Sequence, residues 1–408
     1  MLDTPGISLT ETILRPPLAE APTAVPLFVG LTNVRPVVEP VWVHSFVHFQ
    51  SVFGDPLGHP VSALSDSVNH YFDNGGGPCL VLSLGTPSPG VEWSKDASET
   101  LISYYCEQSV LEMASSHSDA TLICLPDAVG AAEALGDIAY LQRVWIAWMA
   151  SISSHRNKFL LLDGPRSLDD ADRMRENANR QGISNAAVYW PHLITDYPPR
   201  ANGSDVVVPP CGCVAAAIYK TDLTRGIWKA PANVRLDHVL APETVVRGRN
   251  PLFYSDQASF NLIRTLPGQG TRIWGCRTLA EKFPWKYVQT RRLMTFVENN
   301  LSEIARFAVF ETNDEITWLK LKGLSRAWLR RLWLRGALAG STEEDAFRIA
   351  LGLGESMTSD DVASGRMIAR IGVALLRPAE FLEIKLTFNL SGSALSGAGT
   401  VLDEGVPE

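Results

Sequence analysis

Two pairs of residues are the first candidates for metal chemistry. His44 and His48 have the spacing of a helical metal-binding pair. No carboxylate completes a His-Glu-x-x-His motif, and Ser45 is a favourable N-cap residue that would place His44 before the helix begins. Cys211 and Cys213 lack a second Cys or His pair at ligand spacing, so packing of reduced thiols accounts for them better than zinc does. We therefore predict no metal site.

Patterns for catalysis or cofactor binding are also incomplete. Gly268-Gln-Gly270 follows a predicted strand but leads into another strand, whereas a phosphate-binding loop opens a helix, so we predict a hairpin turn. No Gly-x-Ser-x-Gly elbow occurs. Adjacent acids stand in polar contexts typical of loops and first helical turns, where solvated charge is expected: Asp169-Asp170, Glu343-Glu344 and Asp360-Asp361. We predict no catalytic residue and no cofactor.

One charge pattern could serve a partner. Four arginines at helical spacing alternate with Trp and Leu inside a chain that is acidic overall: Arg326, Arg330, Arg331 and Arg335. Long basic side chains often cover apolar helix surface, so a solvated face is one interpretation. Contact with an acidic partner is the other, and exposed charge pairs of this kind give weak, salt-sensitive attachment.

The elements that must position these residues alternate between strands and helices in the first half of the chain. Apolar runs predict strands, and 3.6-residue patterns between them predict helices. The strands are 27–31, 79–84, 121–125, 158–163 and 186–190, and the helices are 62–74, 97–115, 131–153 and 167–181. Such alternation predicts an α/β domain with a mixed, at least partly parallel sheet covered by helices.

The order of elements changes after residue 275. We predict two long helices followed by three strands: helices 286–307 and 314–338, and strands 347–353, 367–376 and 381–390. This order is typical of a smaller α+β domain. The predicted organisation is an extended N-terminal arm at 1–25, an α/β domain at 26–275, an α+β C-terminal domain at 276–390 that ends in an arm strand, and a flexible tail at 391–408.

Composition excludes several other classes. The 408 residues are enough for two or three domains. A net charge of −8 argues against nucleic-acid binding, which usually needs a basic face. The six cysteines are scattered, several of them in apolar runs, so we expect a cytosolic, disulfide-free protein. We expect no signal peptide and no membrane insertion, because no stretch meets the roughly 20 apolar residues of a span.

Two stretches carry the most specific patterns. The first, 211–234, is CGCVAAAIYKTDLTRGIWKAPANV, an apolar helical run followed by a turn. The second, 260–301, is FNLIRTLPGQGTRIWGCRTLAEKFPWKYVQTRRLMTFVENNL, which predicts strand, Pro-Gly turn, strand and amphipathic helix. Both stretches resemble, with many residues in order, the signature region of contractile tail sheath proteins, which form the sleeve around phage tails, R-type bacteriocins and related injection machines.

The resemblance covers most of the chain. Further segments fall in the family's order: Thr4-Pro5-Gly6-Ile7, Ala21 to Gly30, Asn74-Gly75-Gly76-Gly77, Phe310 to Glu315, Leu332-Trp333 with Gly336-Ala337-Leu338, and Arg377 to Phe381. The sequence departs from the family at Thr312, where proline is usual, and at Cys211 and Cys213, where small residues are common. The arm residues Ser8-Leu9-Thr10 are also less typical.

Both ends of the chain show the two-residue alternation of half-buried strands. Prolines at 16, 17 and 22 separate the first of them from the core and keep that connection extended. An extended segment outside its own core can pair with a neighbour's sheet, and the resemblance implies that arms of adjacent subunits do so. Folding back onto the chain's own sheet is the alternative. The predicted arm residues are Ile7, Leu9, Thr10, Ile13, Leu382, Ile384, Lys385, Leu386 and Phe388.

The resemblance implies a structural subunit and not an enzyme. Many copies would form a helical polymer with six-fold symmetry around an inner tube, between baseplate and terminator proteins, and contract to drive the tube through an envelope. The four arginines would face the tube, which the family's C-terminal domain covers. Assembly would take place in the bacterial cytoplasm, with possible release of the particle. Alternatives are a baseplate or tail-terminator protein and, because fold alone cannot exclude it, an α/β enzyme.

Overall fold

The computed structural model describes residues 20–32, 34, 39–54, 63–85, 95–153, 155, 157–179, 183–200, 203–246, 250–253 and 257–377, and the backbone of two strands at 384–386 and 397–399. The predicted arm residues Ile7, Leu9, Thr10, Ile13, Leu382 and Phe388 lie outside these ranges.

The described part of residues 26–275 contains an eight-stranded mixed sheet in the order β11-β10-β6-β5-β4-β1-β3-β2. From β3 to β10 the neighbouring strands are parallel, while β2 and β11 close the two edges antiparallel. The strands are β1 (Pro26–Gly30), β2 (Val41–Val43), β3 (Cys79–Ser83), β4 (Leu122–Cys124), β5 (Phe159–Asp163), β6 (Ala186–Trp190), β10 (Asn261–Leu266) and β11 (Gly270–Trp274). The predicted α/β fold with a partly parallel sheet is confirmed.

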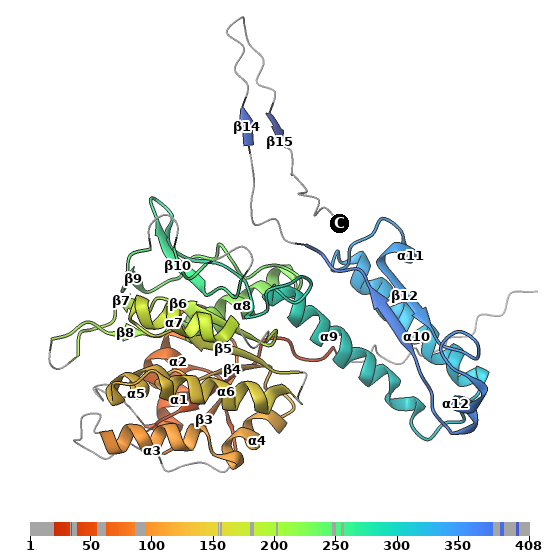
Figure 1. Ribbon diagram of the computed structural model, residues 1–408, viewed down its shortest axis with the longest axis horizontal. Helices are drawn as coiled ribbons and strands as arrows, with labels where there is room; N and C mark the ends of the chain where they lie inside the picture. Colours follow the sequence, from red (N-terminus) through yellow and green to blue (C-terminus); the bar gives the residue numbers. More distant parts are fainter. Residues whose placement is uncertain are drawn as a thin grey trace, which may run out of the picture.

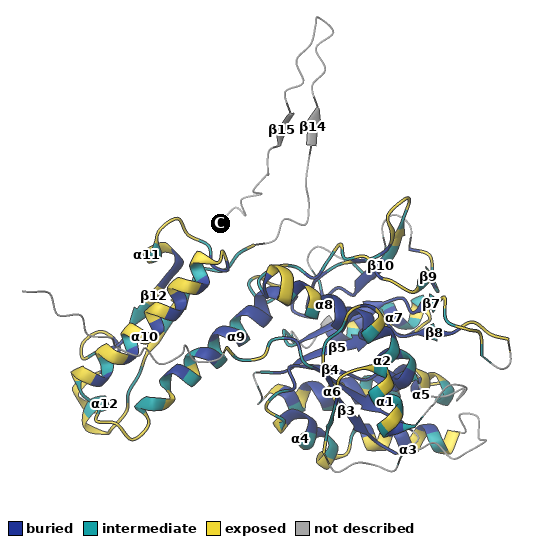
Figure 2. Ribbon diagram, turned by 180° about the vertical axis from the view of Figure 1, so that it is seen from behind, coloured by how far each residue is buried: buried dark blue, intermediate teal, exposed yellow. Residues whose placement is uncertain are grey.

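Helices cover both faces of this sheet, so its central strands are buried throughout and mostly apolar (Figures 1 and 2). In β1, Leu27 and Val29 enter one core, and Phe28 enters the other. The first core is closed by α3 (Lys95–Tyr105), α4 (Gln108–Ser116), α5 (Asp127–Leu135), α6 (Ala139–Ser153) and α7 (Leu168–Asn179). The second is closed by α1 (Phe46–Phe53), α2 (Ala63–Asp73) and α8 (Cys211–Arg225).

Two predicted helices were wrong in their extent. The run 131–153 is divided between α5 and α6, because Gly136 adopts a left-handed conformation (φ 70°) and ends α5. The run 97–115 is divided between α3 and α4, because Glu107 is extended before α4 begins. Gly136 is a residue type that commonly ends helices, so the sequence did indicate the first break. Nothing in the residue types around Glu107 indicates the second break.

The second half packs around a third core of its own. Its elements are α9 (Val288–Ala305), a short 3-10 helix η1 (Arg306–Ala308), α10 (Glu315–Leu334), α11 (Glu343–Ala346), β12 (Phe347–Ala350), α12 (Ser359–Ala363) and β13 (Arg370–Val373). Helix α9 leads away from the large sheet, and α10 lies beside the antiparallel pair β12-β13 (Figure 1). A separate small sheet, β8-β7-β9, joins Val207–Val208, Leu193–Thr195 and Val239–Pro242.

The residues first considered for chemistry have structural roles. Ser45 is the N-cap of α1 and accepts a hydrogen bond from the backbone N–H of His48 (3.1 Å), so His44 precedes the helix as predicted. Gly268 and Gly270 form the predicted hairpin turn between β10 and β11. No group of three or more His, Cys, Asp or Glu side chains in the described ranges could hold a metal ion. No helix of the described chain is long and apolar enough to cross a membrane.

Cys211 and Cys213 lie at the buried start of α8, where the first binds a buried carboxyl group. The backbone N–H of Cys211 donates to Asp163 Oδ1 at 2.8 Å, and burial raises the pKa of Asp163 from 3.8 to about 7. The folded state therefore holds this proton more tightly than the unfolded state does. Stability from Asp163 is present at low pH and is lost as pH rises through about 7.

We expect Asp163→Asn to remove the part of the pH dependence of stability that comes from this carboxyl group. Relative to the native protein, the variant should gain on the order of 2–4 kcal/mol between about pH 5 and about pH 8, because an amide cannot ionise. Buried His70 and His192, whose pKa values fall to about 4, act in the opposite direction but are common to both proteins. Denaturant unfolding at the two pH values measures the difference. If the change in unfolding free energy between the two pH values is the same for the variant and the native protein, Asp163 does not titrate in this window.

Candidate assembly surfaces

Helix α10 carries Arg326, Arg330 and Arg331, and Arg335 is its C-cap; we call it the arginine helix. Asp314 caps it by accepting a hydrogen bond from the Thr317 N–H at 3.0 Å. Its buried side includes Trp328, which contacts Phe296 of α9 with ring centroids 5.7 Å apart. The cap and this apolar contact fix which side of the helix faces away from the third core.

Three of the four arginines form ion pairs within the chain. Arg326 and Arg330 lie 2.5 and 3.4 Å from the carboxylate of Glu343 in α11. Arg335 pairs with Glu20 at 3.1 Å. Arg331 is exposed, and it makes no ion pair with any described residue. The sequence pattern found the arginines but not their acidic partners, which come from other elements.

An exposed apolar line follows the same helix. Ile316, Gly323, Ala327 and Leu334 are separated by 7, 4 and 7 residues and so lie above one another along the axis. Ile316 is 77% exposed and Leu334 is 68% exposed. Arg331 borders this line, so the outer side of the arginine helix is both apolar and cationic. The residue types in the sequence indicate the charge of this helix, whereas the apolar line is visible only once the exposed side of the helix is known.

The start of the described chain forms a second surface. Residues 20–25, which we call the arm root, run between the large sheet and the helices α8, α9 and α10. Backbone groups hold the segment: the Ala21 N–H donates to Asn300 Oδ1 at 3.1 Å, and the Val25 N–H donates to Thr121 Oγ1 at 2.8 Å. The arm root therefore contacts both halves of the chain before β1 begins.

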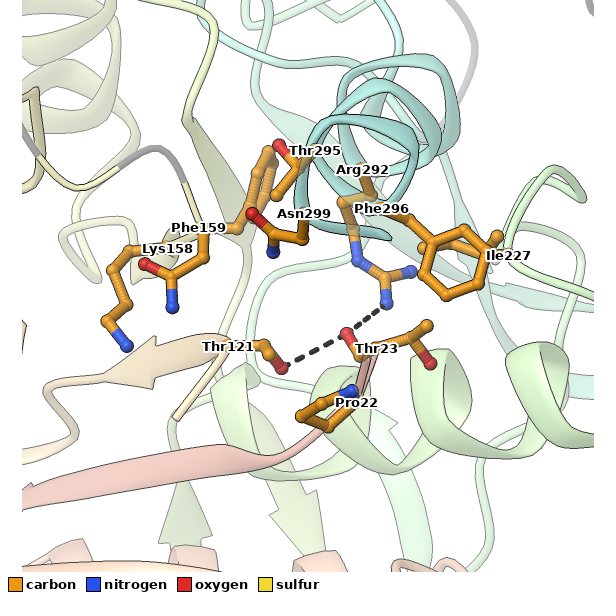
Figure 3. A pocket seen from close by; sticks show the side chains of 11 residues that line it. Pro22, Thr23, Thr121, Lys158, Phe159, Ile227, Arg292, Thr295, Phe296 and Asn299 are labelled. Atoms are coloured by element: carbon orange, nitrogen blue, oxygen red, sulfur yellow. Dashed lines mark hydrogen bonds between the residues drawn. The ribbon is translucent and has the colours of Figure 1, made fainter. Parts of the chain in front are cut away.

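Arg292 of α9 brings a buried charged side chain to the arm root (Figure 3). Its two terminal nitrogens bind the carboxylate oxygens of Asp222 in α8 at 3.0 and 2.5 Å, and one of them also donates to the Thr23 carbonyl at 2.8 Å. Both charged side chains are almost fully buried, at 4% and 7% exposure. Removing one partner of such a pair typically costs about 3–5 kcal/mol, because the other charge is left buried and unpaired.

A groove of about 410 Å³ borders the arm root on the side of α8 and α10. Its walls include Tyr219, Leu223, Ile227, Trp228 and Phe296, together with Arg335 and the arm root itself. The Arg335 guanidinium lies 5.4 Å from the Trp228 ring centroid. Side-chain packing on this side is thus incomplete.

The predicted C-terminal arm is described only in part. Ile384, Lys385 and Leu386 form β14 (Ile384–Leu386), which pairs antiparallel with β15 (Gly397–Gly399). These strands lie apart from the large sheet and from β12-β13 (Figure 1). Gly397–Gly399 fall in the predicted flexible tail, and a strand was not expected there.

Comparisons with known proteins identify the class. Residues 282–389 match the Phage tail sheath C-terminal domain family. A chain from the anti-feeding prophage (AFP) baseplate in its contracted state is 34% identical with a TM-score of 0.82, and the match covers 96% of this chain and 100% of that chain. No curated protein sequence matches the chain.

Two further structures are similar over a comparable length. A chain of the sheath complex of PVC, an extracellular contractile injection system, in its contracted state is 28% identical with a TM-score of 0.72, covering 96% of this chain and 99% of that chain. A chain of the contracted AFP helical sheath is 29% identical with a TM-score of 0.71, covering 95% and 100%. These are structural subunits of contractile particles. The chain belongs to the family of contractile tail sheath proteins.

Proposed function

We propose that this protein is the repeating subunit of a contractile sheath. Many copies polymerise as a helical sleeve around an inner tube, attached to a baseplate at one end and a terminator at the other. The sleeve contracts and drives the tube through a target envelope. The observation that carries this function is the match to sheath and baseplate chains of contractile particles over 95–96% of this chain.

The division of labour along the chain is part of the proposal. The α/β domain at 26–275 and the C-terminal domain at 276–390 form the body. Within the predicted N-terminal arm at 1–25, residues 20–25 attach to this body, and residues 1–19 and the strand around Ile384, Lys385 and Leu386 act as arms that pair with adjacent subunits. Main-chain hydrogen bonds between subunits survive rotation of the bodies, so the arms keep the polymer connected when it contracts.

The work of contraction comes from contacts between subunits. A contracted polymer that buries more domain surface is lower in free energy, so the subunit needs no catalytic site of its own. We propose that it has no enzymatic activity, and that it assembles in the bacterial cytoplasm as part of a phage tail or phage tail-like particle.

A position next to the baseplate is a second candidate for the same subunit. The match to the AFP baseplate chain (34% identity, TM-score 0.82) exceeds the match to the AFP helical sheath chain (29%, 0.71). Negative-stain microscopy of the purified protein tests both positions. Long striated sleeves support the repeating subunit, closed rings that do not extend support the baseplate position, and discrete small oligomers with a ligand-stabilised melting point would contradict both.

We further propose that the outer side of the arginine helix faces the tube. Arg331 forms no ion pair with a described residue, and Ile316 and Leu334 beside it are largely exposed, so this surface offers apolar area together with positive charge. Arg326, Arg330 and Arg335 border this surface, where their internal ion pairs leave them 62%, 62% and 50% exposed. Weak, salt-sensitive attachment suits a sheath that must release the tube.

Charge reversal tests the tube contact. We expect Arg330→Glu with Arg331→Glu to reduce co-sedimentation with preformed tubes by roughly tenfold at low salt, because two attractive charges of up to about 1 kcal/mol each become repulsive. Contracted sleeves formed without a tube should be unaffected. The helix should persist, since Glu and Arg have similar helix propensities. The proposal would be wrong if the variant binds tubes as well as the native protein does and if this binding does not respond to salt. These arginines would then be solvent-exposed charges with no role in tube binding.

A further inference from the structure

Polar contacts, more than side-chain packing, hold the arm root against the body of the subunit. A groove borders one side of residues 20–25, where side-chain packing is incomplete. On the other side, the Thr23 carbonyl accepts hydrogen bonds from Arg292 (2.8 Å) and from Thr121 Oγ1 (3.0 Å). Thr121 stands at the start of the sheet strand β4, whereas Arg292 belongs to α9. The two donors fasten one carbonyl to two different parts of the subunit.

The Arg292 side chain is itself fixed. Asp222 binds both of its terminal nitrogens, so the guanidinium has one orientation. One of these nitrogens, Nη2, also donates to the Thr23 carbonyl (Figure 3). Asp222 lies one turn before the end of α8, and Arg292 lies in the second turn of α9. The contact therefore joins α8, α9 and the arm root at a single buried point.

We propose that Arg292 is the anchor of the N-terminal arm. It fixes the direction in which the chain leaves the body, and it passes tension on the arm to α8 and α9. The inference rests on the proposed function, in which residues 1–19 reach a neighbouring subunit. A pull on that arm acts first on residues 20–25, and without the anchor these residues would separate from the sheet towards the groove before the body could rotate.

The position of the other contacts supports this role for Arg292. The Glu20–Arg335 pair is exposed at 40% and 50%, so solvent weakens it. The Ala21–Asn300 hydrogen bond holds one backbone N–H. Only Arg292, among the side chains that the structure shows bound to the arm root, brings a buried charge that is shared with another helix. Its removal should loosen the arm root while leaving β1 in the sheet.

The test uses the full-length chain with Arg292→Met combined with Asp222→Leu. Replacing both charges with apolar side chains avoids an unpaired buried charge, so the body should remain folded. Hydrogen exchange of the Ala21 and Val25 amides should accelerate by roughly tenfold or more, with the β1 amides unchanged. Sleeves should be shorter or should break on contraction. Arg291→Met is the matched control, because Arg291 is the adjacent arginine and its ion pair is with Glu298.

Each outcome has a defined meaning. Faster exchange in the arm root together with defective sleeves supports the anchor. Unchanged exchange overturns it, and so does faster exchange with sleeves that assemble and contract normally. Arg292→Lys provides a second variant if the double variant does not fold: it keeps the charge beside Asp222 but loses the planar fork, and the same exchange increase is expected. A chain without residues 1–17 that still forms normal sleeves would contradict the proposed arm function, while the exchange measurement would still report on the contact itself.

Discussion

Removing residues 1–17, or ending the chain after Leu376, is expected to produce a folded subunit that does not form sleeves. The buried core residues of the described chain lie between Ala24 and Met357, so neither truncation removes a core side chain. If the arms pair as proposed, each truncation removes main-chain hydrogen bonds between subunits, worth about 1 kcal/mol each, and every loss of about 1.4 kcal/mol lowers association about tenfold. Losing several of these hydrogen bonds at each contact between subunits should abolish sleeves at protein concentrations where the native chain assembles.

Circular dichroism, thermal unfolding and negative-stain microscopy of each truncation separate folding from assembly. Native-like melting without sleeves is the expected combination. Full-length sleeves from the double truncation would contradict the arm hypothesis. Unfolding of the C-terminal truncation would instead show that the last strand stabilises its own subunit, which is the alternative that the alternation pattern leaves open.

Among single substitutions that conserve the shape of a side chain, we expect Asp127→Asn to cause the largest loss of stability. Asp127 is 1% exposed at the start of α5. Its Oδ2 accepts the Leu31 N–H at 2.8 Å, and its Oδ1 accepts the N–H groups of Ala63 (2.6 Å) and Leu64 (3.1 Å). One carboxylate thus joins the end of β1, the start of α2 and the start of α5.

An amide can accept hydrogen bonds through only one of the two positions. Asp127→Asn leaves either the Leu31 N–H or the α2 N–H groups facing an NH₂ group, and we expect a loss of about 3 kcal/mol in the free energy of unfolding. Urea unfolding measures it. Asp137→Asn is a control, because Asp137 is an exposed acid just before the next helix and should change stability by less than about 0.5 kcal/mol. Equal midpoints for the two variants would contradict this role for Asp127.

The same carboxylate explains a glycine in one of the family-like segments. A Cβ atom on Gly30 would lie 2.4 Å from Asp127 Oδ2 and 2.9 Å from Leu64 Cδ1. Position 30 must therefore lack a side chain because of Asp127 and Leu64, which are 97 and 34 positions further along the sequence. The segment PLFVG shows the glycine, but it does not show what requires it.

Sequence by itself determined the layered α/β body, because strands buried on both faces must be apolar throughout and helices with one buried side must repeat every 3.6 residues. It also determined the family, through ordered motifs that the structural comparisons bear out. Local rules placed the Ser45 cap and the Gly268 turn in the same way. All of these signals are carried by neighbouring residues, so they can be recognised before the chain is folded.

Tertiary structure alone decided the partners of the charged residues. Glu20 and Arg335 are 315 positions apart, and Asp222 and Arg292 are 70 apart. Such pairs leave no period in the sequence, because a contact between distant elements depends on how the intervening chain folds. The four arginines therefore looked alike in the sequence. In the folded chain Arg335 pairs with Glu20 of the arm root, and Arg326 and Arg330 pair with Glu343. Arg331 lies beside the exposed apolar line.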